Sequence, residues 1–301
     1  MSKQQIRLGL IGYGEVGSGI GSGLRKAGLE HVVAYDIAAF EGTFSALIQQ
    51  RAAEAGVRLV RAPNELAQEA DVIIVAVPGS ECIAAAKSFA AVLDAHHVYV
   101  DIGSATPRVK RTVGDVLAAS GAQVADGGIM GSPLNDGYKI LIKGSGPASQ
   151  TFADALVPWG MRYDVVSDVL GAGSGIKIIR SVVMKGMEAL FIECALGASR
   201  SGIEDDVFAS IAEFMDARPF METVKFLLRT DVIHAGRRAE EAAMSAEALE
   251  EVGIEPVMTR STSAVLQRSA DMRLKEQFKG VVPDDYKAAV EAIDHALKVS
   301  V

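Results

Sequence analysis

The sequence predicts an α/β fold, in which a doubly wound parallel sheet is followed by an all-helical C-terminal domain. From residue 6 to about residue 166, short β-branched segments alternate with amphipathic segments, which is typical of a parallel sheet covered by helices. After Gly173 the strand signals stop, and long segments rich in Ala, Leu, Met and Glu continue to the C-terminus. The 301 residues suit two domains, which we place at 1–168 and 169–301.

Six segments have clear strand character, and a weaker pair is expected to extend the same sheet. The six are Ile6–Ile11, His31–Tyr35, Val57–Val60, Val72–Val77, His97–Asp101 and Gln123–Ala125, and the pair is Lys139–Lys143 and Arg162–Val166. The helix-like segment PASQTFADALVPWG separates the weaker pair.

The second half is expected to be a series of helices. Breaks are predicted near Gly202, Pro219, Gly253 and residues 280–283. The first helix should run from about Ser174 to about Ala198 and link the two domains. Its many Ile, Val, Met, Leu and Phe residues predict burial on most sides. An apolar helical domain of this kind leads us to expect a homodimer.

Composition and charge exclude several classes of partner. The chain is 49% hydrophobic and 23% charged, as expected for a compact globular protein. A formal net charge of -8 argues against nucleic-acid and anionic-lipid partners, because these require clustered Lys and Arg. The sequence has no secretory signal and no apolar run of membrane-spanning length, so we expect a cytoplasmic protein. Cys82 and Cys194 lie far apart, which indicates neither a disulfide nor a metal site.

Gly12, Gly14 and Gly17 form a GxGxxG motif between the first predicted strand and a helix. The first glycine permits the tight turn, the second lets a pyrophosphate approach the backbone, and the third lets helix and strand pack closely. The helix N-terminus offers unpaired amides and the positive end of its dipole. The motif predicts a Rossmann-type dinucleotide site, which also includes Tyr13, Glu15 and Val16.

Asp36 distinguishes this motif from an ordinary glycine-rich turn. It ends the second predicted strand, about 20 residues after Gly17, where a carboxylate can accept hydrogen bonds from the adenosine ribose hydroxyls. The same carboxylate would repel a 2′-phosphate, which favours NAD as the cofactor. NADP stays an alternative, since neighbouring cations could compensate.

Residues at the ends of the next strands are expected to line the nicotinamide end of the crevice. Val77 and Pro78 end the fourth predicted strand, and Ser104 follows the fifth. Structural roles compete with this interpretation: Pro78 can simply stop a strand, and Ser104 can cap the helix that starts near Pro107.

Lys177 lies just inside an otherwise apolar helix, where a lysine requires a partner or a function. At about 100° per residue, Ser181, Lys185 and Glu188 lie on the same face. This polar stripe lines a cleft or forms a buried ion-pair network. Burial and a nearby Arg180 or Lys185 would lower the pKa of Lys177.

Four motifs together resemble the β-hydroxyacid dehydrogenase family, which includes 3-hydroxyisobutyrate and 6-phosphogluconate dehydrogenases. They are the glycine motif at 12–17, DIGSATP at 101–107, DGGIMGS at 126–132 and GAGSGIK at 171–177, spanning about two thirds of the chain. The resemblance implies hydride transfer between a nicotinamide cofactor and a small anionic hydroxy acid. It also implies that Lys177 is the catalytic acid/base.

The resemblance assigns substrate contacts to positions where this chain departs from the family. Met130, Gly131 and Ser132 replace the usual SGG segment, and Ser181 stands where asparagine is common. We expect the Ser132 hydroxyl and the Gly131 backbone N–H to hold the substrate carboxylate, while Ser104 orients the substrate hydroxyl.

The segment HAGRRAEE resembles a branch whose terminal domain is phosphogluconate-dehydrogenase-like. Its His234, Arg237 and Arg238 share one helix face and form a candidate site for an anionic substrate. The alternative is a solvated face on which Glu240 and Glu241 pair with the arginines.

Two further functions stay open. Imine reductases and reductive aminases share the scaffold, although they commonly carry an acidic residue or tyrosine at the lysine position. A regulatory protein could instead retain the cofactor site without turnover, and the altered substrate segment leaves room for this alternative.

Overall fold

The computed structural model describes residues 5–299 and divides into two compact units, one ending at Val182 and the other starting at Val183. The division lies within one long helix, α8 (Ala172–Ser201), which both units share. The predicted domain boundary, after residue 168, lies just before this helix begins.

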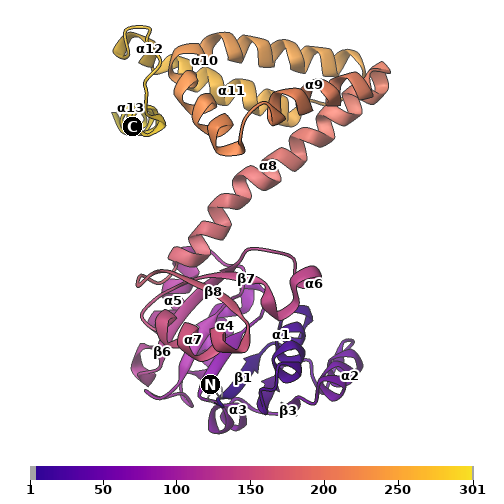
Figure 1. Cartoon of the computed structure of the whole chain (residues 1–301), viewed down its shortest axis with the longest axis vertical. Coiled ribbons are helices and arrows are strands. Elements are labelled where there is room, and N and C mark those ends of the chain that lie inside the picture. The colour runs from indigo at the N-terminus through magenta and orange to yellow at the C-terminus, as the bar shows by residue number, and fades with distance from the viewer. Residues whose placement is uncertain (1–4, 300–301) are drawn as a thin grey trace. The chain divides into compact units, whose positions relative to one another are not determined.

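The first unit contains a single eight-stranded sheet, as predicted (Figure 1). The strands lie in the order β3-β2-β1-β4-β5-β6-β7-β8. The order of the first six strands is that of a doubly wound dinucleotide-binding fold. The strands are β1 (Arg7–Ile11), β2 (His31–Tyr35), β3 (Arg58–Val60), β4 (Val72–Val75), β5 (Val98–Asp101), β6 (Gln123–Ile129), β7 (Leu141–Ser145) and β8 (Arg162–Ser167).

Two features of the sheet differ from the sequence prediction. β6 continues to Ile129, whereas the sequence predicted an end at Ala125. The second half of the strand was not predicted because Gly127 and Gly128 have low strand propensity. β7 pairs antiparallel with β6, whereas the other pairs are parallel. The connection at 130–140 is shorter than the dozen or so residues that a parallel crossover needs.

Helices cover both faces of this sheet, because successive strand residues point to opposite sides. One core cluster joins strand residues such as Leu10 to α1 (Glu15–Lys26), α2 (Ser45–Ala55) and α7 (Ser149–Leu156). The other joins residues such as Ile73 to α3 (Pro63–Glu69), α4 (Cys82–Phe89) and α5 (Pro107–Leu117). A short helix, α6 (Pro133–Asp136), and 3₁₀ turns at Gly79–Glu81, Ala118–Ser120, Gly137–Lys139 and Val157–Trp159 complete the unit.

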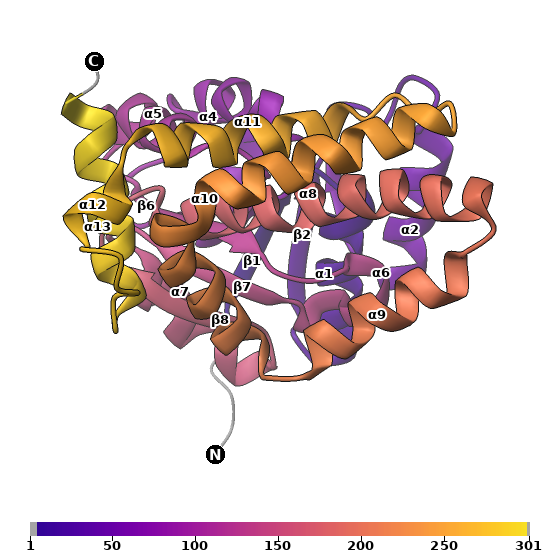
Figure 2. The ribbon, with the colours of Figure 1, turned by 90° about the horizontal axis from the view of Figure 1, so that it is seen from above.

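The second unit is helical throughout its described residues, which confirms the prediction. It comprises the remainder of α8 with α9 (Glu204–Asp216), α10 (Phe220–Glu251), α11 (Val257–Asp271), α12 (Leu274–Gln277) and α13 (Tyr286–Val299). α10 and α11 lie side by side (Figure 2). A small core around Val232 and Leu274 on α10 and α12 includes Ala289 and Ala292 of α13.

The expected burial of α8 on most sides is wrong for the single chain. Ile179 and Val182 are each 72% exposed, and Ile192 is 57% exposed. Apolar side chains along this 30-residue helix are therefore substantially exposed instead of buried. None of the helices in residues 5–299 has the length and apolar character to cross a membrane.

Candidate active site

The glycine motif forms the turn between β1 and α1, and its three glycines meet different surroundings. Gly12 has a φ of +86°, and a Cβ there would lie 2.7 Å from the carbonyl oxygen of Ala76. A Cβ on Gly17 would lie 2.0 Å from the carbonyl oxygen of Gly12. Gly14 has no neighbouring atom within 4 Å of such a Cβ, so the chain itself leaves the space beside it open.

A cavity of about 290 Å³ lies beside this turn, at the carboxyl ends of β1, β2 and β4. Five residues predicted for cofactor binding line it, and they come from three separate segments of the sequence: Gly12, Gly14, Asp36, Val77 and Pro78. The cavity lies where a doubly wound sheet binds its ligand. Its lining therefore brings together half of the ten predicted cofactor residues.

The Asp36 carboxylate is fixed at this cavity by two backbone amides. It accepts hydrogen bonds from the N–H groups of Tyr13, at 2.7 Å, and Ala38, at 2.8 Å. The Tyr13 side chain is fully buried in the core, and this burial raises its pKa to about 12 although Arg51 acts in the opposite direction. The Tyr13 side chain thus lies in the core and its N–H is bound to Asp36, so neither group is free to contact a cofactor.

The remaining predicted residues of the motif lie on α1 itself. Glu15 is exposed in its first turn, and Val16 packs partly against the core. Gly14 is the N-cap residue, so the first amides of α1 have no partner within the helix. An open space beside Gly14, free helix amides and a carboxylate at the end of β2 fit a dinucleotide.

Ser104 and Lys177 meet at the neighbouring strand end. Lys177 Nζ donates a hydrogen bond to Ser104 Oγ. Thr106, not Ser104, caps α5, since its Oγ1 accepts the N–H of Val109 at 3.5 Å. A Cβ on Gly79 would lie 1.9 Å from the carbonyl oxygen of Ser104, so the segment after Pro78 packs directly against this turn. The pair thus adjoins the rim of the cavity.

The electrostatic surroundings of Lys177 favour its neutral form. The side chain is half-buried, and desolvation lowers its pKa below the ordinary value; the charge of Lys110 lowers the pKa further. The sequence interpretation placed this second charge on Arg180 or Lys185. Arg180 is exposed, and Lys110 is the cation that acts.

Lys110 itself is buried and paired with a buried carboxylate. Its Nζ lies 2.8 Å from Asp101 Oδ1 and 3.1 Å from the Asp101 carbonyl oxygen. Lys110 was not among the predicted site residues, although the sequence carries a signal for it: Lys110 shares the buried face of α5 with Val113 and Leu117 at helical spacing.

Asp101 organises the turn that carries Ser104. Its Oδ1 accepts the N–H of Gly103 at 2.9 Å and the thiol of Cys82 at 3.4 Å. Burial, together with the Asp101 charge, raises the pKa of Cys82 to about 12, so the thiol stays protonated. This network fixes the backbone immediately before Ser104.

The polar stripe along α8 is not a buried ion-pair network. Ser181 turns its hydroxyl to the carbonyl oxygen of Lys177, at 2.9 Å, and so bonds to its own helix. Lys185 and Glu188 form an exposed ion pair at 3.0 Å. The polar partner of the Lys177 amine is the Ser104 hydroxyl, not a carboxylate of this stripe.

Backbone N–H groups in the segment 130–132 already donate hydrogen bonds within the protein. The N–H of Met130 donates to the carbonyl oxygen of Leu141 at 2.8 Å. The N–H of Ser132 donates to Asp136 Oδ2 at 3.2 Å, and a Cβ on Gly131 would lie 2.4 Å from the same oxygen. The Asp136 carboxylate, four residues later in the turn, thus binds the Ser132 amide, which is next to the Gly131 amide that we expected to hold the substrate. The Ser132 side chain makes no capping hydrogen bond.

The three HAGRRAEE residues lie on α10 in the second unit. His234 and Arg237 line a hollow of about 430 Å³, together with Arg273 and Lys275. Arg237 is paired with Glu241, as the surface-pairing alternative predicted. Arg238 donates to Thr230 Oγ1 at 2.8 Å.

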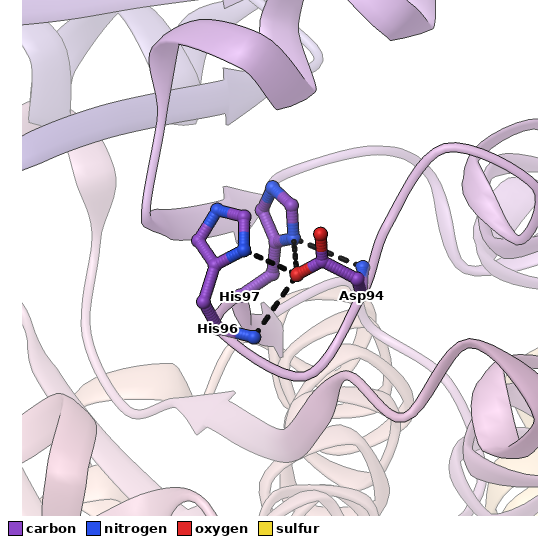
Figure 3. A group of neighbouring side chains, drawn as sticks. All are labelled: Asp94, His96 and His97. Atoms are coloured by element: carbon purple, nitrogen blue, oxygen red, sulfur yellow. Dashed lines mark hydrogen bonds and ion pairs between the residues drawn. The ribbon is translucent and has the colours of Figure 1, made fainter.

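Asp94, His96 and His97 form a cluster in the loop before β5 (Figure 3). His97 is buried; its Nδ1 accepts the N–H of Asp94 at 3.0 Å, and its Nε2 therefore donates to the carbonyl oxygen of Ala67 at 3.0 Å. His96 pairs with the Asp94 carboxylate. Both ring nitrogens of His97 serve the turn, so the geometry favours a structural role over metal binding.

Two family models match separate parts of the chain. Residues 7–105 match a model described as NADP oxidoreductase, coenzyme F420-dependent. Residues 198–269 match a domain of unknown function, DUF1932. An uncharacterised 28.5 kDa protein of Methanothermus fervidus is 23% identical over 258 residues, covering 85% of this chain and 96% of its own.

A solved structure identifies the family. Conserved protein MTH1747, of unknown function and described as structurally similar to 3-hydroxyacid dehydrogenases, is 31% identical, with 90% of this chain and 99% of that chain covered and a TM-score of 0.61. This chain belongs to the same 3-hydroxyacid dehydrogenase-like family. The resemblance inferred from the motifs is thereby confirmed.

The fold is shared more widely. A reductive aminase from Aspergillus terreus, solved with NADPH and ethyl levulinate, has a TM-score of 0.72 at 16% identity, with 96% of this chain and 99% of that chain covered. At this identity the likeness shows the fold alone.

Proposed function

We propose that this protein is a nicotinamide-dependent oxidoreductase that interconverts a small hydroxy acid and its carbonyl form, with Lys177 as general acid/base. The observation that carries the proposal is the Lys177–Ser104 hydrogen bond beside the glycine-lined cavity. The NADP-oxidoreductase model over residues 7–105 supports the same class of cofactor.

The cavity residues would hold the cofactor by separate contacts. The open space at Gly14 and the first amides of α1 would take the pyrophosphate. Asp36 would accept hydrogen bonds from the adenosine ribose, and Val77 and Pro78 would lie toward the nicotinamide. The residue after Asp36 is Ile37, which offers no positive charge to a 2′-phosphate. We therefore propose NAD as the preferred cofactor and keep NADP as the alternative.

Lys177 would handle the proton of the reaction. When bound, a nicotinamide ring supplies the capacity to accept or donate hydride. In the oxidation direction, the neutral Lys177 amine takes the proton of the substrate hydroxyl as the C–O single bond becomes a carbonyl, and Ser104 orients that hydroxyl. In reduction the ammonium form returns the proton. Partial burial and the Lys110 charge lower the pKa of the Lys177 amine, which is the direction that this proton transfer needs.

The substrate would be held near Ser132. The Ser132 hydroxyl makes no capping hydrogen bond to α6, so it can bind the substrate carboxylate. Met130, Gly131 and Ser181 stay secondary candidates on the grounds of position. His234, Arg237 and Arg238 would contribute only if the hollow on α10 takes part in substrate binding.

A second copy of the chain would cover the apolar surface of α8. Ile176, Ile179, Val183 and Leu190 follow one face at helical spacing and are 41%, 72%, 51% and 39% exposed. We call these four residues the apolar stripe. A contiguous apolar stripe on a protein without membrane-spanning helices in its described part favours a homodimer.

Cofactor titration followed by a substrate panel tests the proposal. NADH and NADPH binding is measured by fluorescence, and turnover is then followed with small hydroxy acids and, separately, with carbonyl–amine pairs. Oxidation of a hydroxy acid that disappears in Lys177→Met supports the proposal. Turnover confined to the carbonyl–amine pairs would assign imine reduction, and tight cofactor binding without any turnover would assign a regulatory protein.

A further inference from the structure

A buried carboxylate on β6 holds the first turn of α8. Asp126 is 1% exposed. Its Oδ1 accepts the N–H of Gly171 at 2.6 Å, and its Oδ2 accepts the N–H of Ser174 at 3.0 Å and the Ser174 hydroxyl at 2.5 Å. A carboxylate at a helix N-terminus satisfies amides that lack intrahelical partners and interacts favourably with the helix dipole.

Ser145 on β7 completes this attachment. Its hydroxyl donates to Asp126 Oδ1 at 2.6 Å and accepts the N–H of Gly173 at 2.7 Å. The amides of Gly171, Gly173 and Ser174 are therefore bound by side chains from two neighbouring strands. The entry of α8 has a fixed position on the sheet.

The backbones approach closely at the same place. A Cβ on Gly128, two residues after Asp126, would lie 2.7 Å from the carbonyl oxygen of Gly173 and 2.9 Å from Lys177 Cβ. A Cβ on Gly173 would lie 2.2 Å from the carbonyl oxygen of Lys143. Lys177, three residues after Ser174 on α8, thus has its Cβ directly against β6 at Gly128.

We propose that Asp126 is a positioning residue for Lys177: its carboxylate, with Ser145, fixes the first turn of α8 so that the Lys177 amine is held against Ser104. The inference rests on the proposed role of Lys177. The carboxylate does not touch the amine and acts through the helix. Since Ser104 is fixed separately by the Asp101 turn, two independent attachments to β5 and β6 set the distance between the two groups.

The second unit provides a matched control. Glu193, 9% exposed, accepts the N–H groups of Met258 at 2.6 Å and Thr259 at 3.0 Å, and the Thr259 hydroxyl at 2.8 Å. It therefore binds the first turn of α11 with the same kinds of donors as Asp126, but α11 carries none of the proposed catalytic residues. Loss of either carboxylate should destabilise a helix start, and loss of Asp126 alone should release Lys177.

The experiment measures the ionisation of Lys177 without substrate or cofactor. Acetic anhydride labels the wild type, Asp126→Asn and Glu193→Gln across a pH series, and peptide mass spectrometry gives the extent of Lys177 acetylation. Thermal melting of the same preparations reports stability. Ser174→Ala, which removes only one hydroxyl donor, replaces Asp126→Asn if that variant does not fold.

We expect Asp126→Asn to shift the Lys177 titration toward higher pH, since the amine leaves its partly buried site, while Glu193→Gln lowers the melting temperature and leaves the titration unchanged. Where turnover is measurable, kcat should fall by about 10²-fold in Asp126→Asn only. A folded Asp126→Asn protein with the wild-type Lys177 titration would overturn the inference. A shifted titration in a protein that oxidises no hydroxy acid would retain this inference and refute the proposed function.

Discussion

The two units differ in what they bury. The first unit encloses large apolar side chains on both sheet faces and also buries Asp101, Lys110 and Asp126 with hydrogen-bonded partners. In the described part of the second unit, the large aliphatic side chains that are buried are Val232, Ile254 and Leu274. Many of its other large hydrophobic residues, such as Phe191 and Met244, are substantially exposed.

This difference assigns different tasks to the two units. Burying a charge costs desolvation energy that close partners offset, and the first unit places the Asp101–Lys110 pair and the hydrogen-bonded Asp126 beneath Ser104 and α8. An exposed apolar surface instead requires cover from another molecule. We therefore expect variants at the charged and polar groups of the first unit to change chemistry at constant oligomeric state, and variants on the exposed apolar surface of α8 and the second unit to change assembly first.

The largest effect is expected from Lys177→Met in the first unit. The methionine has a similar length and no ionisable group, so folding and NADH binding should be nearly intact. General acid/base catalysis contributes about 10²- to 10⁴-fold, and kcat should fall by that order. Melting temperature, NADH affinity and single-turnover hydride transfer are measured on one preparation. Near-normal hydride transfer in this variant would remove Lys177 from the mechanism.

The pH profile of the wild-type enzyme also tests Lys177 as the general acid/base. Hydroxy-acid oxidation requires the neutral amine, so kcat/KM should rise with pH and level off at the Lys177 pKa. Burial and Lys110 lower that pKa from 10.5, and the plateau should therefore begin below the ordinary lysine range. Reduction requires the ammonium form and should decline over the same interval. A plateau only at ordinary lysine pH would contradict the structural surroundings.

The second effect in size concerns the apolar stripe. Val183→Lys places a charge on the exposed stripe and should convert a dimer to monomer with a lower melting temperature, as seen by sedimentation velocity. Glu188→Lys, on the opposite face of α8, is the control and should leave the assembly unchanged. A wild-type protein that sediments as a monomer would refute the expectation that a second copy covers α8.

Particular residues show where sequence reasoning was sufficient. Gly12 and Asp36 follow fixed spacings set by the turn and by strand length, so local chemistry alone predicted their common cavity. Lys177 was found because a lysine in an apolar helix is conspicuous. Lys110 was missed because its neighbours Arg108 and Arg111 make α5 look solvated. The proposed role of Asp126 could not be predicted from local sequence, because it depends on a hydrogen bond between β6 and α8 that joins residues 48 positions apart.

An intermediate effect is expected from Asp36→Ala. Hydrogen bonds to a charged group contribute about 1.5–3 kcal/mol, so NADH binding should weaken by at least about tenfold. NADPH binding should change much less, because the variant also removes repulsion of the 2′-phosphate. Parallel titrations of both cofactors decide the matter, with melting temperature as the control for the lost Tyr13 hydrogen bond. A wild type that prefers NADPH would contradict the assignment of NAD.

The smallest effect is expected from Arg237→Ala, which asks whether the second unit takes part in the chemistry at all. Arg237 and Glu241 are 62% and 50% exposed, and an exposed ion pair contributes at most about 1 kcal/mol to the free energy of unfolding. Cofactor affinity and KM should both stay at wild-type values. Arg238→Ala is the internal comparison: it removes a bond to the buried Thr230 and should lower stability more, again without a change in KM. If Arg237→Ala instead raises KM at unchanged stability and cofactor affinity, the hollow on α10 binds substrate, and chemistry is not confined to the first unit.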